Sequence, residues 1–124
     1  MGLDGRRVVV TRRPEQAGRL SAALGAAGAD VIELPTIRIE PPESWTEVDG
    51  SIRMMTSGSF DWVAFTSANA VEKFLSRLGC MPEEAFVSTK VAAVGPATRA
   101  SLEAKGIGVD LVPDSYTGLS LARA

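Results

Sequence analysis

The sequence predicts an α/β fold built on parallel strands. Three short apolar runs each lead into a polar turn, at residues 11–13, 66–69 and 95–98. After each turn, apolar residues recur three or four positions apart, which is the spacing of one buried helix face. Successive strand–helix–strand units of this kind form parallel, right-handed connections. We therefore expect Rossmann-like parallel sheets.

The first of these units occupies the N-terminal third of the chain. Residues 8–10 predict a strand, Pro14 suits the first position of a helix, and Gly28 suits the left-handed residue after its end. Residues 31–34 predict the next strand. The apolar stripe that this helix is expected to bury consists of Ala17, Leu20, Leu24 and Ala27.

A domain boundary is expected near Pro41. Residues 36–40 alternate polar and apolar side chains like a crossover strand, and Pro41 and Pro42 stiffen the chain after it. We expect residues 1–40 to form one unit and residues 41–124 another. The second unit should begin with a helix opened by a capping box of Ser44 and Glu47.

The stretch from 60 to 74 is the centre of the second unit. Residues 62–65 predict a buried strand, and Ser67 is the expected N-cap of the next helix. The unpaired N–H groups of such a helix start, beside the positive end of its dipole, suit an anionic ligand. The alternative is that Ser67 only caps its own helix.

The rest of the second unit repeats this pattern. Residues 91–94 predict a strand, the turn from Gly95 to Thr98 leads into a helix, and residues 109–112 predict another strand. A further helix is expected to begin after Asp114-Ser115-Tyr116-Thr117. Thr98 could bind a ligand, although a threonine so near a helix start is often simply exposed.

Composition limits the classes of function. The chain has 124 residues, 45% of them hydrophobic and 23% charged, with a net charge of −2. These values suit a soluble globular domain and give no basic excess for binding nucleic acid. No apolar run is long enough for a membrane span and the N-terminus lacks a signal-peptide pattern, so we expect no membrane association and a cytoplasmic location.

The side chains available for catalysis are few. The chain has no histidine and one cysteine, which excludes His/Cys zinc sites and Ser-His-Asp triads. It also lacks a paired carboxylate dyad, a G-x-G-x-x-G fingerprint and a Walker lysine. Arg12 and Arg13 could clamp a carboxylate, or could form a solvated edge. Such a protein binds a ligand or promotes a reaction by positioning it.

Three segments resemble uroporphyrinogen-III synthases: Val8-Val9-Val10-Thr11-Arg12, the run from Asp61 to Val71, and Val94-Gly95-Pro96-Ala97-Thr98-Arg99-Ala100. The resemblance implies a fold of two Rossmann-like lobes joined by a two-stranded linker, present here only in part. On this basis residues 1–40 would be the first part of lobe 1 with its crossover strand. Residues 41–124 would be the first part of the inserted lobe 2, truncated.

The same resemblance implies an activity. The family closes linear hydroxymethylbilane into uroporphyrinogen III with inversion of ring D, as a hydro-lyase of heme, siroheme and cobalamin biosynthesis, with no metal and no organic cofactor. The substrate carries eight carboxylates, which suit helix-start amides and hydroxyls. The implied substrate-binding residues are Thr11, Arg12, Thr66, Ser67, Ala68, Asn69 and Thr98, and none is implied to be catalytic.

Family members are longer than this chain, so we expect a fragment that is inactive alone and that self-associates. Tyr116 belongs to a different motif from the family's cleft tyrosine. The alternative is a non-catalytic α/β ligand-binding or receiver-like module. A receiver would need acidic side chains at its strand ends, where Thr11, Ser67 and Gly95 stand instead.

Overall fold

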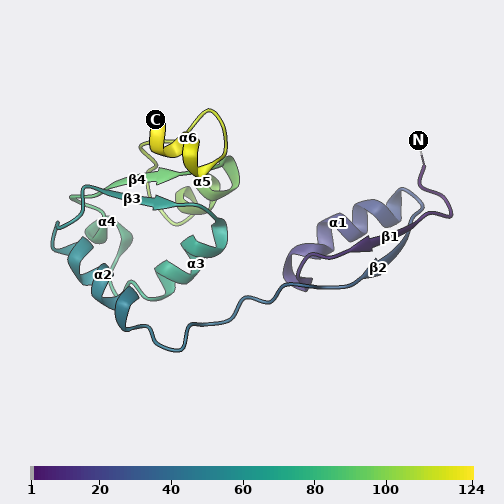
Figure 1. Cartoon of the computed structure of the whole chain (residues 1–124), viewed down its shortest axis with the longest axis horizontal. Coiled ribbons are helices and arrows are strands. Elements are labelled where there is room, and N and C mark those ends of the chain that lie inside the picture. The colour runs from purple at the N-terminus through teal and green to yellow at the C-terminus, as the bar shows by residue number, and fades with distance from the viewer. Residues whose placement is uncertain (1) are drawn as a thin grey trace. The chain divides into compact units, whose positions relative to one another are not determined.

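The computed structural model describes residues 2–124, and the chain divides into two compact units, Met1–Pro42 and Glu43–Ala124 (Figure 1). The sequence predicted a boundary between residues 40 and 41. The assignment of the two units to two lobes stays a prediction. Residues 34–45, which join the last strand of the first unit to the first helix of the second, have no regular secondary structure.

The first unit is a single β-α-β motif. Strand β1 (Arg7–Val10) leads into helix α1 (Pro14–Ala26), and strand β2 (Asp30–Glu33) follows. The two strands pair in parallel, as the sequence predicts. Gly28 has φ +91°, a left-handed conformation that turns the chain from the helix into β2.

Only one face of this two-stranded sheet is covered. Val10 and Ala17 are buried where α1 lies against the strands, whereas Val9 and Ile32, paired on the opposite face, are 53% and 45% exposed. The expected burial of Leu20 is wrong, since this side chain is exposed. A sheet of two strands is too narrow to cover the whole apolar stripe of a helix.

The second unit holds the remaining elements (Figure 1). In chain order these are α2 (Thr46–Thr56), β3 (Trp62–Phe65), α3 (Ala68–Ser76), α4 (Pro82–Ala85), β4 (Lys90–Ala93), α5 (Pro96–Glu103) and α6 (Gly118–Arg123). No helix within the described residues is long and apolar enough to cross a membrane.

Strands β3 and β4 pair in parallel, with Phe65 opposite Ala93. One face of this pair packs on α3 and α5. The core cluster there consists of Phe65, Val71, Val91, Ala93, Leu102 and Ile107. The ring of Phe65 meets that of Phe74 edge-on, with centroids 5.4 Å apart, which fixes α3 against the sheet.

The prediction of a buried strand at residues 62–65 is correct for the face that carries Phe65 and wrong for the opposite face. Trp62 is 46% exposed and Ala64 is also exposed, while Phe65 is buried. Helix α6 lies near this face and leaves a pocket lined by Trp62, Ala64, Ala92, Leu111, Leu121 and Ala124. Both faces of β3 are apolar, which explains the uninterrupted apolar run in the sequence. The described residues cover only one of these faces.

The start of α2 also differs from the prediction. The N-cap residue is Trp45, which makes no side-chain cap bond, and Ser44 Oγ accepts a hydrogen bond from the Thr46 N–H at 3.2 Å. The helix thus starts one residue later than a capping box at Ser44 requires. Glu47 is then its second residue and not its third.

The strand expected at residues 109–112 is reduced to one parallel bridge between Ala92 and Leu111. The Asp110 N–H donates to Val91 O at 2.8 Å, and the Ala93 N–H donates to Leu111 O at 2.9 Å. Before these contacts along β4, a side chain replaces the backbone acceptor, because Asp110 Oδ2 accepts a hydrogen bond from the Val91 N–H.

Candidate functional site

Two of the predicted polar turns lie side by side at the carboxyl edge of the β3–β4 pair. The Val94 N–H donates to Phe65 O at 3.1 Å, so both strands end at the same level before the turns of residues 66–69 and 95–98. Helices α3 and α5 start from these turns and pack against each other (Figure 1). The carboxyl edge of a parallel sheet is where α/β folds bind ligands.

Ser67 is the N-cap of α3, as predicted. Its backbone is extended, with φ −155° and ψ 155°, and its Oγ accepts a hydrogen bond from the Ala70 N–H at 3.1 Å. The Ser67 carbonyl oxygen accepts from the Val71 N–H. The Ala68 N–H has no acceptor among the described residues, and it lies in the same half-buried turn as Ser67 and Asn69. This amide is therefore available to a ligand.

The first position of α3 keeps a backbone N–H that three other helices of the described residues lack. Helices α1, α4 and α5 begin with Pro14, Pro82 and Pro96, which have no N–H to offer. Helix α3 begins with Ala68 and keeps the donor. At the shared edge, α3 thus provides one more amide for an anion than α5 does.

Thr98 is buried in α5, contrary to the alternative of an exposed threonine. It is 5% exposed and lies one helical turn before the fully buried Leu102, on the packed side of the helix. Its side chain therefore contributes to packing. Thr66, at the other turn, is exposed.

Tyr116 also lies at this edge, although it is not among the predicted substrate-binding residues. A Cβ atom placed on Gly95 would be 3.8 Å from Tyr116 Cβ, so this tyrosine stands directly beside the turn before α5. Its side chain is 62% exposed. The signal in the sequence was the polar run that ends in Thr117, the N-cap of α6.

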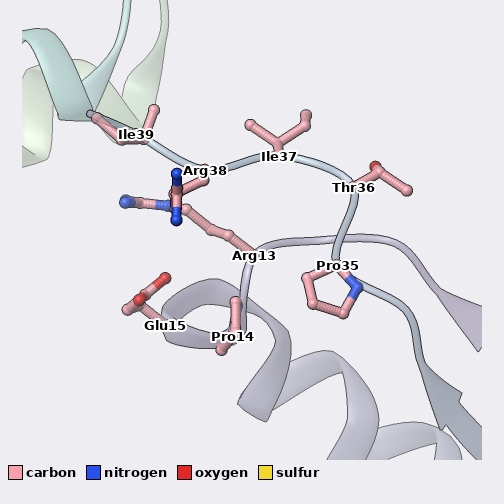
Figure 2. A pocket seen from close by; sticks show the side chains of 8 residues that line it. All are labelled: Arg13, Pro14, Glu15, Pro35, Thr36, Ile37, Arg38 and Ile39. Carbon is pink, nitrogen blue, oxygen red and sulfur yellow. The ribbon is translucent and has the colours of Figure 1, made fainter.

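Thr11 and Arg12 belong to the other unit, so their turn is described by itself. Both are exposed. The Thr11 carbonyl oxygen accepts hydrogen bonds from the Thr36 N–H at 3.2 Å and from Thr36 Oγ1 at 3.3 Å. A pocket of about 400 Å³ lies beside this turn, and it is lined by Arg13 and Arg38 and not by the two predicted residues (Figure 2).

The two turns at the carboxyl edge of the β3–β4 pair offer hydrogen-bond donors but carry no charged side chains. They carry Thr66, Ser67, Asn69 and Gly95, and no cluster of three or more histidine, cysteine or acidic side chains that could hold a metal occurs in the described part of the chain. Backbone amides, hydroxyls and two helix starts are suited to carboxylates. Such a site can bind and orient an anion, and it offers no acid/base pair.

Comparison with known proteins gives a consistent result. A family model described as uroporphyrinogen-III synthase HemD matches residues 18–124. The uroporphyrinogen-III synthase of Synechococcus elongatus is 38% identical over 120 residues, which are 96% of this chain and 45% of the relative. That of Chlorobaculum parvum is 28% identical over 122 residues, which are 98% of this chain and 48% of the relative. The chain thus spans about half the length of the curated relatives it matches.

Two solved structures share the fold. The uroporphyrinogen III synthase of Thermus thermophilus aligns with 97% of this chain and 50% of its own, with a TM-score of 0.58 and 24% identity. The uroporphyrinogen-III synthetase of Helicobacter pylori aligns with 98% of this chain and 53% of its own, with a TM-score of 0.68 and 15% identity. These likenesses confirm the predicted fold class. The family-model match over residues 18–124 establishes that the chain belongs to the uroporphyrinogen-III synthase family.

Proposed function

We propose that the full-length protein containing this chain closes hydroxymethylbilane into uroporphyrinogen III with inversion of ring D. The observation that carries the proposal is the edge where the turns before α3 and α5 meet. It presents amides and hydroxyls without acid/base side chains. That is the chemistry needed to hold a substrate rich in carboxylates.

The reaction requires positioning more than proton transfer. Ring closure removes the substrate hydroxyl as water and joins two ends of a flexible chain, so the entropy of bringing those ends together is a large part of the barrier. Binding several carboxylates at once lowers this entropic part of the barrier. On this account Ser67, Ala68 and Asn69 bind substrate carboxylates mainly through the backbone, and Thr66 and Thr98 border the same region.

The two units take different parts in this proposal. Residues 1–40 belong to the first lobe and residues 41–124 to the inserted second lobe. Thr11 and Arg12 supply contacts from the first lobe. The protein works in the cytoplasm on a small-molecule substrate and does not bind nucleic acid.

The test is the product isomer formed by the full-length protein. Hydroxymethylbilane cyclises without an enzyme to the type I isomer, so only an enzyme that inverts ring D yields the type III isomer. We expect type III to dominate at substoichiometric protein. Type I alone, at the rate seen in buffer, would overturn the proposal.

A further inference from the structure

We infer that Arg13 and Arg38 form a carboxylate-binding site in the pocket beside the start of α1. The pocket has a volume of about 400 Å³ and is lined by Arg13, Pro14, Glu15, Pro35, Thr36, Ile37, Arg38 and Ile39. Figure 2 shows the two arginine side chains extending from different segments into the same region. Two guanidinium groups in one pocket are typical of carboxylate recognition.

The path of the chain after β2 creates this pocket. The Leu34 N–H donates to Val10 O at 2.9 Å, and Thr36 donates twice to Thr11 O. These bonds continue the parallel pairing beyond the two strands. They hold the segment that carries Arg38 beside the turn that carries Arg13.

The charges in the pocket favour an anion. Its lining has two arginines and one carboxylate, that of Glu15, which lies in the first turn of α1. A carboxylate at that place complements the helix dipole. The formal charge of the lining side chains is therefore +1.

Arg38 also pairs with Glu40, through its Nη2 and Glu40 Oε1. Both side chains are largely exposed, at 84% and 59%, and exposed pairs contribute little stability and exchange readily. A guanidinium presents five N–H donors, so one carboxylate does not saturate it. A ligand carboxylate can join Glu40 on Arg38 or replace it.

The pocket accommodates a short carboxylic side chain with its carboxylate between the two arginines. The apolar side chains of Pro14, Pro35 and Ile37 provide the contact for its methylene groups. Assigning this ligand to a carboxylate of the linear tetrapyrrole rests on the proposed function. Carboxylate binding as such does not depend on it.

The test uses the 124-residue chain with glutarate as the probe at low ionic strength, monitored by NMR through the Nε–H signals of Arg13 and Arg38. Glutaramide serves as the uncharged control and chloride as the general anion. We expect saturable shifts of both signals with glutarate alone. We also expect Arg38→Gln to weaken glutarate binding about tenfold, because a charge-assisted hydrogen bond is lost.

The matched control is Arg19→Gln, which removes an exposed arginine of α1 outside the pocket. It should bind glutarate like the unsubstituted chain. Equal shifts with chloride, or equal loss of binding in Arg19→Gln and Arg38→Gln, would overturn the inference. Glutarate binding by a protein whose full-length form makes no type III isomer would overturn the proposed function and leave this site in place.

Discussion

Asp110 and Val91 are bound to each other twice. The Asp110 N–H donates to the Val91 carbonyl oxygen, and the Val91 N–H donates to Asp110 Oδ2, both at 2.8 Å. Val91 is 2% exposed and lies in β4, whose other side pairs with β3. The carboxylate thus satisfies a buried amide at the edge where the sheet would otherwise need a third strand.

Replacing Asp110 by leucine should destabilise the second unit by about 1 kcal/mol, because the Val91 amide loses its acceptor. Asp110→Asn keeps an acceptor of the same size and should cost less. Urea unfolding followed by tryptophan fluorescence measures both variants. Equal stability of Asp110→Leu and the unsubstituted chain would show that water replaces the carboxylate without cost.

This contact also explains what the sequence could and could not predict. The cap at Ser67 and the turn at Gly28 depend on neighbours within a few residues, and both were correct. Residues 109–112 have a strand-like pattern, yet Asp110 binds the amide of Val91 through its side chain, and the backbone pairing is limited to one bridge between Ala92 and Leu111. That outcome depends on a partner 19 residues away.

The candidate site was also partly predictable, because some of its features depend only on residues close together in the sequence. The donors of the turn at Ser67 follow from the helix start itself. The pocket of Arg13 and Arg38 was not predictable, because it depends on how residues 34–36 pair beyond β2. The alternation of polar and apolar side chains at residues 36–40 did not indicate that Arg38 would lie on the side of this segment that faces the turn of Arg13.

A second prediction concerns pH. The side chain of Arg77 donates two hydrogen bonds to the carboxylate of Asp49, which holds the pKa of Asp49 below its usual value. A lowered pKa in the folded state stabilises the protein above the unfolded-state pKa, which is about 3.9. This contribution is lost as the pH falls through the folded-state value.

Asp49→Asn should therefore unfold more easily than the unsubstituted chain at pH 7, and the difference should shrink below about pH 4. Urea titrations at a series of pH values measure it. Arg53→Gln is the control, since Arg53 makes a smaller contribution to the same pKa. A difference that stays constant down to pH 2 would contradict the role of the ion pair.

A third prediction separates capping from substrate binding at Ser67. Ser67→Ala should cost about 1 kcal/mol of stability and lower kcat/KM of the full-length enzyme less than tenfold, because one neutral hydrogen bond is lost. Ser67→Asp caps the helix equally well but brings a negative charge to the site. It should keep the stability and raise KM at least about tenfold. Normal kinetics for Ser67→Asp would leave Ser67 as a cap only.

A fourth prediction concerns association of the 124-residue chain. The uncovered face of the β1–β2 pair exposes Val9, Ile32 and Leu34, at 53%, 45% and 58%. Apolar surface beside open strand edges favours self-association. Sedimentation equilibrium should show a dimer or larger species, weakened by Ile32→Lys and not by Leu119→Lys, which changes a more exposed apolar residue of α6. A monomer at every concentration would contradict the prediction.

The central claim is that backbone amides at the start of α3 bind the substrate's carboxylates, and Ala68 allows one amide to be removed selectively. Proline is tolerated at the first position of a helix, as at Pro96 of α5. The extended backbone of Ser67 also suits a residue before proline. Ala68→Pro should therefore fold normally while losing the N–H of residue 68.

The decisive measurement is kcat/KM of the full-length enzyme with Ala68→Pro, beside Ala68→Gly, which removes the methyl group and keeps the amide. A hydrogen bond to a charged group contributes about 1.5–3 kcal/mol, so we expect a loss of about 10- to 100-fold for Ala68→Pro and little change for Ala68→Gly. Unchanged kcat/KM in a stably folded Ala68→Pro enzyme would contradict the account.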